Sequence, residues 1–362
     1  MTLKNRREVY PPLKVLQDYA HIGLKSWAEI DTIRDTLKNL GRSWDESIYI
    51  PSWCIWLGIS MLGDDNAELS FNTLNSLSIL SAALTSWRRC KEVYRFHAEM
   101  EQMLYEQGTD CRFPVEILRH LPYPCIYLET PELGNKEYHG FFVYLDQKMD
   151  KSMFMLRFIG ISKEGAIRDN YDLELKKSED IISVMELEIV KIMAMMKLEN
   201  KWSSDELMQK MEERKTILLG LVQLLLYICA ENADLERSGS SLPTVSTAVV
   251  RPEITEQKVI KDKYHEIEAW NVGYRVVRSI KATVQAENTQ STTVSESDHK
   301  HRNRKRPRPH LRRGHWHLFR IGKRTMPEQQ RLILHWLSPI PVNIKRGQET
   351  ELPVVINSID RN

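Results

Sequence analysis

Residues 308–317 hold the densest group of chemically capable side chains in this chain of 362 residues. The segment reads Arg308-Pro-His-Leu-Arg-Arg-Gly-His-Trp-His317 and contains three arginines, three histidines and one tryptophan. Guanidinium groups bind phosphates, imidazoles titrate near neutral pH, and indole rings stack on unpaired bases. These residue types point to nucleic acid, and three interpretations of the segment are open.

The first interpretation is contact with nucleic acid through charge and stacking. Its candidate residues are Arg308, His310, Arg312, Arg313, His315, Trp316, His317, Phe319 and Arg320. The alternative is a structural segment, in which Trp316 belongs to the core and the histidines are hydrogen-bonded, or a solvated basic tail.

The other two interpretations use the spacing of His315 and His317, which a strand would place on one face. Two such imidazoles beside arginines are suited to general acid–base cleavage of RNA, so both are candidate catalytic residues of a ribonuclease. They could also ligate a transition metal, but the surrounding arginines repel a cation. We therefore expect no metal and no cofactor. The sequence contains none of the common nucleotide-binding or hydrolase motifs, and enzymatic activity stays open.

The net charge of +2 hides a strong segregation of charge along the chain. Between Asp298 and Glu328 there are 11 lysines and arginines and no acid. Subtracting those 11 from the total of 51 leaves 40 basic against 49 acidic residues, so the rest of the chain carries −9. An acidic body is suited to a polypeptide partner, whereas the basic run is suited to nucleic acid.

The elements that must position these residues indicate an α+β fold. Apolar residues recur at helical spacing from Leu74 to Trp87 and onward to Leu104, so residues 1–120 are predicted to be mainly helical. Three short strands separated by turn formers predict a small antiparallel meander. These strands are Cys125–Leu128, Gly140–Leu145 and Met153–Ile159.

Two long helices are predicted to follow the meander and complete a region spanning 121–235. The first covers Ile181–Lys197, with residues 178–180 as its cap, and the second runs from Asp205 to about Ala230. Ser203 and Glu206 have the spacing of a capping box for the second helix. Its apolar stretch, Ile217–Ala230, is too short to span a membrane and predicts a buried helix.

The rest of the chain divides by composition into connectors and one basic module. Strands are predicted at His315–Ile321 and Arg331–Leu337 within that module. The predicted divisions are a linker at 236–256, an ordered segment at 257–286, a disordered basic linker at 287–309, a C-terminal module at 310–347 and a tail at 348–362.

Methionine use marks a candidate peptide-binding groove beside the meander. Nine of the 14 methionines lie within residues 149–211, and Met-rich surfaces adapt to varied apolar partners. The candidate peptide-binding residues are Tyr127, Phe142, Tyr144, Met193 and Met196. The alternative is that these side chains fill an ordinary core.

The N-terminal residues and the cysteines indicate the cellular compartment of the protein. Residues 1–14 contain no apolar run of the length of a secretory signal, and the five cysteines are an odd number with no CxxC pair. We expect a reduced, cytoplasmic protein.

Arg308–His317 resembles the RPHxRRGHWH signature of the second type V-A anti-CRISPR family. Other segments resemble that family in the same order along the chain, over roughly 70–345. They are Ser86-Trp87-Arg88 with Val93-Tyr94, Leu121-Pro-x-x-Cys-Ile-Tyr-Leu128, Leu221–Asn232, and Leu332–Trp336 followed by Pro341-Val342.

The resemblance implies an inhibitor encoded by a phage or other mobile element that evades host defence in the bacterial cytoplasm. Such an inhibitor would recognise the nascent N-terminal polypeptide of the type V CRISPR effector nuclease and cause loss of its messenger RNA. RNA or the ribosome would be a further partner, with no role for a membrane. The alternative is a ribonuclease or nucleic-acid-binding regulator of a phage or plasmid unrelated to CRISPR.

Overall fold

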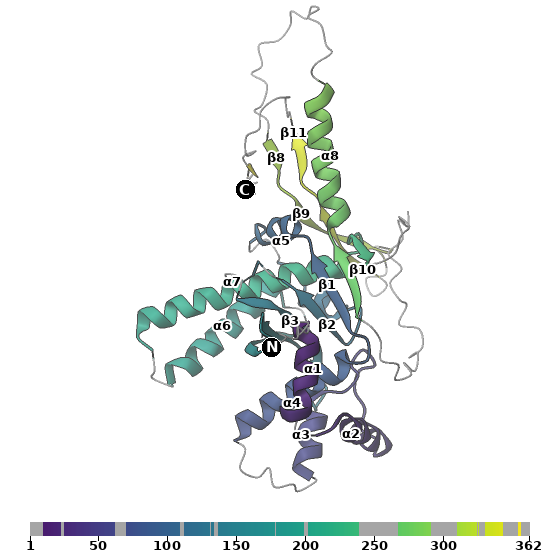
Figure 1. The fold of residues 1–362 in the computed structure, drawn as a ribbon, viewed down its shortest axis with the longest axis vertical. Coiled ribbons are helices and arrows are strands. Elements are labelled where there is room, and N and C mark those ends of the chain that lie inside the picture. Colours follow the sequence, from purple (N-terminus) through teal and green to yellow (C-terminus); the bar gives the residue numbers. More distant parts are fainter. Residues whose placement is uncertain are drawn as a thin grey trace, which may run out of the picture.

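The structure is a computed structural model that confirms the α+β fold class (Figure 1). It describes residues 10–22, 25–61, 70–108, 112–130, 132–133, 137–177, 179–198, 202–238, 267–290, 310–323, 325, 330–342 and 354–355. Seven strands form one mixed sheet in the order β5-β4-β3-β2-β1-β7-β6. Their bounds are β1 Glu92–Phe96, β2 Cys125–Glu129, β3 Tyr138–Gln147, β4 Phe154–Ser162, β5 Ile167–Leu175, β6 Leu235–Arg237 and β7 Glu268–Val272.

The predicted meander is present as β2, β3 and β4, which pair antiparallel. Two features of the sheet were missed by sequence reasoning. β5 extends the meander at the edge, and β1 lies at the centre, parallel to both β2 and β7. The helical spacing that the sequence shows from Leu74 onward to Leu104 is therefore interrupted by a strand that was not predicted. Lys91, with a φ of 48°, follows the end of α4, and the next five residues extend into β1 instead.

Four N-terminal helices cover one face of the sheet (Figure 1). They are α1 (Pro11–Ile22), α2 (Trp27–Asn39), α3 (Ser52–Met61) and α4 (Phe71–Trp87). Alternation along the strands sends Cys125 and Tyr127 toward these helices and Ile126 and Leu128 toward the opposite face. The central strands β2, β3 and β4 are thus buried on both sides, which explains their nearly continuous apolar sequence.

The opposite face of the sheet is covered by α5 (Ala98–Tyr105), the 3-10 helix η2 (Val115–Arg119), α6 (Ile181–Leu198) and α7 (Ser204–Cys229). The predicted capping box is confirmed: the Ser203 side chain accepts from the Glu206 N–H, and the Glu206 carboxylate accepts from the Ser203 N–H. The C-terminal half of α7 is buried, as predicted. Among the described helices, none is long and apolar enough to cross a membrane.

The C-terminal part begins with α8 (Tyr274–Gln290), which packs beside α5 and β11. The two predicted strands are confirmed at their predicted bounds as β9 (His315–Ile321) and β10 (Arg331–Leu337), which form an antiparallel hairpin. A small separate sheet joins β8 (His310–Arg312), β11 (Ile340–Val342) and β12 (Val354–Val355).

Both predicted linkers begin within elements of regular secondary structure. The segment predicted as a linker from residue 236 begins inside β6, and residues 239–266 lie outside the described part of the chain. The basic linker predicted from residue 287 begins inside α8, and 291–309 lie outside the described part. Cys54, Cys90, Cys125 and Cys229 are buried thiols that form no disulfide among the described residues. Cys111 is outside the described residues.

Candidate functional site

The outer face of the β9–β10 hairpin gathers histidine and aromatic side chains. Strand alternation places His315, His317 and Phe319 together there, and all three are exposed. The register puts His335 of β10 directly opposite His317. The Phe319 ring lies 4.1 Å from the His317 ring and 5.0 Å from the His335 ring, measured between centroids. These rings form a continuous exposed surface that a nucleic-acid base can stack on.

The inner face of the hairpin is part of the main core. Trp316 is only 8% exposed, and its indole Nε1 donates a hydrogen bond of 2.7 Å to Oε1 of Gln223 in α7. Its ring meets that of Trp336 edge to face at 4.9 Å. Trp316 therefore fills the core role that the sequence had left open and is covered on the side where a base would stack.

Gly314 explains the spacing of the Arg-Arg-Gly-His-Trp-His motif. A Cβ atom at this position would lie 2.6 Å from Cζ2 of Trp336 and 2.9 Å from the carbonyl oxygen of Leu337. Only a glycine lets the backbone approach the Trp336 ring this closely. The motif thus joins β8 to β9, turns one tryptophan inward and leaves its two histidines facing outward.

The arginines near this face differ in how they are placed. Arg312 and Arg320 are exposed, and Arg320 lies on the opposite side of β9 from the histidines. Arg313 is half-buried, and its Nε and Nη2 atoms are shielded without an acceptor among the described residues.

For two of the residues predicted to bind nucleic acid, the position of the side chain is not described. Arg308 is outside the described part of the chain. The backbone of His310 pairs with Val342 in the small sheet, and its side chain is not described.

The polar contacts of the histidines on this face are few among the described residues. His335 Nε2 lies 3.7 Å from a carboxylate oxygen of Glu231, which is also paired with Arg331. Among the described side chains, no hydrogen bond links His315 or His317 to a carboxylate. Within the same part of the chain, no group of three or more His, Cys, Asp or Glu side chains is arranged to hold a metal ion.

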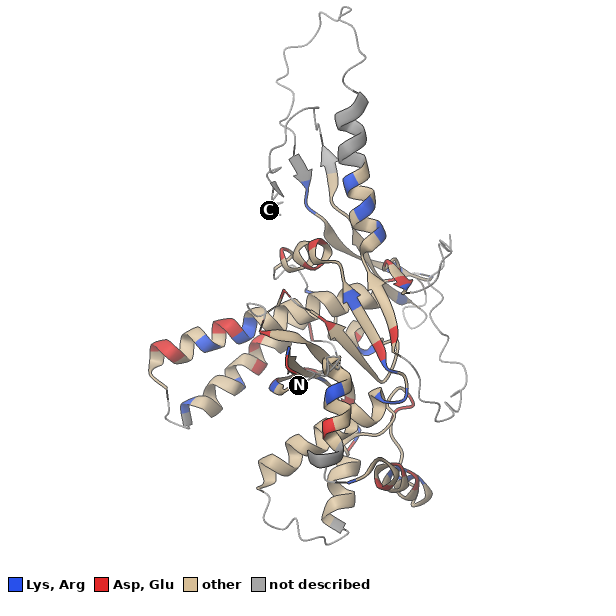
Figure 2. Cartoon of the chain, viewed as in Figure 1, with Lys and Arg blue, Asp and Glu red and all other residues tan. Residues whose placement is uncertain are grey.

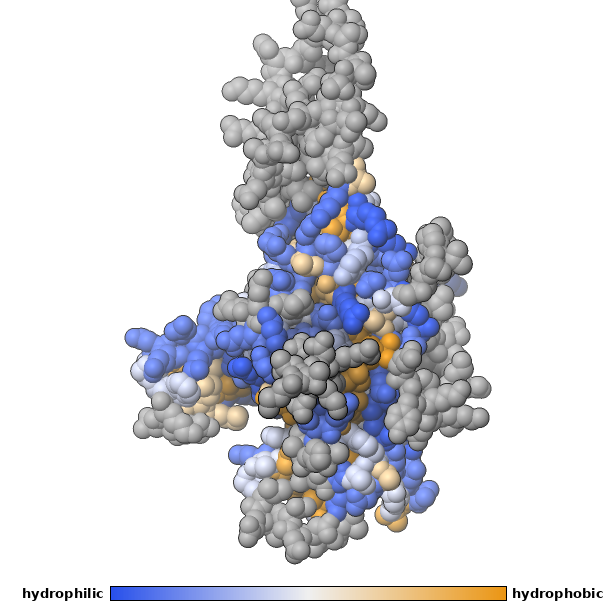
Figure 3. Space-filling model, viewed as in Figure 1, coloured by the Kyte–Doolittle hydropathy of each residue, from blue (hydrophilic) through white to orange (hydrophobic). Residues whose placement is uncertain are grey.

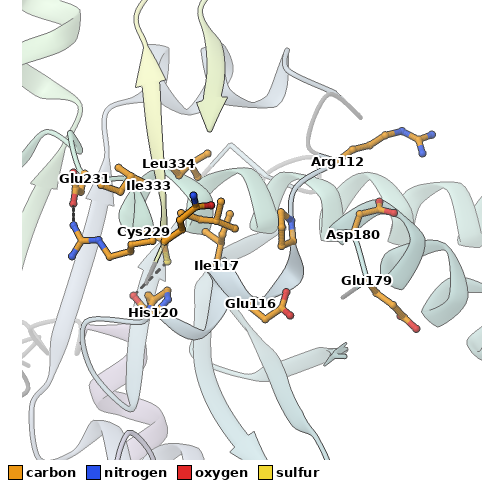
Figure 4. A pocket seen from close by; sticks show the side chains of 14 residues that line it. Arg112, Glu116, Ile117, His120, Glu179, Asp180, Cys229, Glu231, Ile333 and Leu334 are labelled. Carbon is orange, nitrogen blue, oxygen red and sulfur yellow. Dashed lines mark hydrogen bonds and ion pairs between the residues drawn. The ribbon is translucent and has the colours of Figure 1, made fainter. Parts of the chain in front are cut away.

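A groove of about 700 Å³ opens where β10, η2 and the adjoining ends of α6 and α7 meet (Figure 4). Ile117, Ile333 and Leu334 supply its apolar wall. Glu116, Glu179 and Asp180 gather toward one end, while Glu231 lies at the other. Asp180 caps α6, and hydrogen bonds from Ser183 hold the pKa of that carboxyl below its usual value.

One edge of β10 borders this groove. In an antiparallel pair, every second residue turns its backbone groups away from the partner strand. Leu334 and Trp336 turn theirs toward the end of α7, where Glu231 N–H donates to the Leu334 carbonyl and Asn232 binds both backbone groups of Trp336. Leu332 is the preceding residue in this series and lines the groove. Among the described residues, no backbone hydrogen bond is formed by Leu332 on this side of β10.

The predicted peptide-binding residues lie elsewhere. Tyr127, Phe142 and Tyr144 are fully buried between the sheet and the N-terminal helices, so their assignment to a peptide groove was wrong. Met193 and Met196 are half-buried between α6 and α7. Sequence reasoning missed His335 and Glu231, although the alternation of β10 could have pointed to His335.

Comparisons with known proteins agree with this architecture. The sequence profile of the anti-CRISPR type V subtype A2 family (AcrVA2-like) matches residues 94–344. The chain is 25% identical over 295 residues to Protein FinQ of Escherichia coli, covering 76% of this chain and 79% of that protein. It shares its fold with the chain titled "Crystal structure of AcrVA2", at a TM-score of 0.57 and 15% identity, over 92% of this chain and 97% of that chain.

Proposed function

This chain belongs to the anti-CRISPR type V subtype A2 family, and from that membership we propose how it acts. It recognises a polypeptide segment of a type V CRISPR effector nuclease in the host cytoplasm and lowers effector production through loss of the effector's mRNA. The C-terminal hairpin contacts RNA. The observation that carries the proposal is that the matched residues 94–344 include both the groove beside β10 and the exposed histidine face.

The groove supports recognition of an extended polypeptide. A peptide can pair with the edge of β10 at Leu332, where no described residue forms a backbone hydrogen bond, and this is the β-augmentation mode of binding. Its apolar side chains would pack on Ile117 and Ile333, and a basic side chain would reach the carboxylates of Glu179 and Asp180. A nascent chain is extended when it is first exposed, so it can supply this geometry before it folds.

The hairpin supports contact with RNA. Arg312 and Arg320 supply exposed positive charge, Arg313 supplies a guanidinium without an acceptor among the described residues, and Phe319 with His317 offers a stacking surface. The basic run that precedes the hairpin in sequence adds charge that favours any nearby phosphate backbone. If the groove binds the nascent polypeptide while the hairpin binds the message, one molecule of this protein holds both.

The deciding experiment co-expresses the protein with a type V effector in bacteria and measures effector mRNA and effector protein. We expect both to fall. Synonymous recoding of the first codons changes the RNA and keeps the polypeptide, so the loss should persist. A compensated frameshift over the same codons changes the polypeptide and should abolish the loss. A loss that follows the RNA sequence instead would refute polypeptide recognition.

A pair of variants localises the recognition. Glu179→Lys reverses a charge in the groove, whereas Glu213→Lys reverses a charge on the exposed side of α7. Only the first should restore effector mRNA. Equal behaviour of the two variants would place recognition outside the groove.

Replacing Arg312 and Arg313 by Ala is expected to weaken RNA binding about tenfold and to reduce the salt dependence of binding. Replacing Arg302 and Arg304 is expected to have a smaller effect. Arg312 and Arg313 adjoin the ordered hairpin and therefore lose less conformational entropy on binding. Titration of a labelled RNA at two salt concentrations measures both quantities, and equal effects of the two double variants would contradict this order.

The same samples distinguish contact from catalysis. The ribonuclease alternative rests on His315 and His317, which share the outer face of the hairpin. RNA cleavage by the purified protein that disappears in a His315→Ala/His317→Ala variant would replace the contact role with a catalytic one.

A further inference from the structure

α6 and the first half of α7 form an arm that projects from the body of the molecule (Figure 1). α6 has 18 residues, of which only Glu186, Glu188, Lys191 and Lys197 are charged. A small internal cluster of Ile189, Leu207 and Met211 holds the two helices together. Figure 2 shows that the charges of the arm concentrate on α7, and Figure 3 shows apolar surface along its α6 side. An exposed helix this apolar is typical of one that has a partner.

Apart from Met195, which is 62% exposed on the neighbouring side, the exposed residues of α6 gather on one face. From Glu186 and Leu187 this face continues at intervals of three or four residues through Val190, Ala194 and Lys197. We call this face the α6 stripe. Val190 is 60% exposed at its centre. A cavity of about 320 Å³ opens beside Val190 and is lined by Ile182, Met185 and Leu219, among others.

The charges of the stripe lie at its two ends. Glu188 and Lys191 are on the other side of α6, where Lys191 bridges Glu188 and Glu174 of β5. Glu186 and Lys197 form no ion pair with any residue that the structure describes. The stripe is therefore acidic at its N-terminal end, apolar in the middle and basic at its C-terminal end.

This pattern is complementary to itself. If two copies of the stripe pack antiparallel about an axis near residues 191–192, each Glu186 faces Lys197 of the second copy. Val190 then meets the second copy's Ala194, a small residue that allows close approach. An interface of this kind repeats every contact twice, as two-fold symmetry requires. Two helical hairpins joined in this way form the four-helix arrangement that buries apolar faces a single hairpin leaves open.

We propose that the α6 stripe is a homodimer interface, through which two copies of this chain join their arms antiparallel. The groove beside β10 and the histidine face are formed by residues outside the α6 stripe, so a dimer carries two copies of each. Dimerisation in this form would raise the avidity for partners that carry more than one binding site.

Sedimentation of the full chain from about 1 to 100 µM tests the proposal. The wild type should show concentration-dependent dimerisation, and a monomer throughout this range would overturn the proposal. Glu186→Lys and Lys197→Glu should each raise the dissociation constant about tenfold, because each variant creates two like-charge contacts per dimer. The double variant restores opposite charges and should dimerise like the wild type.

Two further variants separate this interface from general surface effects. Val190→Glu places a charge at the centre of the stripe and should leave the chain monomeric, while circular dichroism confirms that it is folded. Glu212→Lys on the exposed side of α7 is the matched control and should dimerise normally. If the double charge exchange fails to restore association, or if Glu212→Lys weakens it as much as Glu186→Lys, the antiparallel stripe is not the interface.

Discussion

Replacing Trp316 by alanine is expected to lower the free energy of unfolding by about 3–5 kcal/mol. The ring packs between Tyr227 and Trp336 and is almost fully buried. Its removal leaves a cavity and also leaves Oε1 of Gln223 without its hydrogen-bond donor. Urea denaturation followed by far-UV circular dichroism measures the change.

Trp202→Ala is the matched control, because Trp202 is 40% exposed and lies directly before the cap of α7. It should cost less than about 1 kcal/mol. The pair also tests the role of the motif. If Trp316→Ala left stability unchanged and reduced only RNA affinity, the tryptophan would be a ligand-contacting residue and its core role would be refuted.

Replacing Arg157 by methionine is expected to destabilise the fold by a similar amount, about 3–5 kcal/mol, at neutral pH. Arg157 Nε lies 2.8 Å from a carboxylate oxygen of Asp146, whose side chain is 2% exposed. Burial by itself would lower the pKa of Arg157, but the carboxylates of Asp172 and Asp146 outweigh it and raise this pKa. Without the guanidinium, a buried carboxylate loses its compensating charge.

Asp146 also joins the N-terminal helices to the sheet. The backbone N–H of Ser52, at the start of α3, donates to one carboxylate oxygen at 3.0 Å, and the Ser52 hydroxyl donates to the other at 2.6 Å. Loss of Arg157 therefore weakens the contact between two layers of the fold as well as a single ion pair. Chemical denaturation at pH 7 measures the change in the free energy of unfolding.

Two controls make the Arg157 result interpretable. Arg168→Met removes an exposed arginine whose guanidinium lies 3.9 Å from Glu137, and it should cost less than about 1 kcal/mol. Adding Asp146→Asn to Arg157→Met removes the uncompensated charge and should recover part of the lost stability. A double variant as unstable as the sum of its single changes would show that the two side chains do not interact.

The elements that sequence predicted well are those whose signals are local. The Ser203–Glu206 capping box defined the start of α7 because both partners lie within one helical turn. The bounds of β9 and β10 followed from short apolar alternations between turn formers. β1 was not predicted because the spacing of its apolar residues fits a helix and a strand equally well. Its pairing with β7, some 176 residues later in the chain, is a contact that no local pattern records.

For the candidate site as well, some properties follow from the sequence and others only from the tertiary structure. By itself, the sequence determined which residue types gather at Arg308–His317, that charge is segregated along the chain, and which family the motifs resemble. The direction in which each side chain faces was decided by the tertiary structure. Pairing of β9 with β10 turned Trp316 into the core and left His317 outside beside His335. Covering the sheet on both faces removed Tyr127, Phe142 and Tyr144 from any surface. Burial is a property of the assembled layers, because a strand's two faces become core or surface only when other elements pack on them.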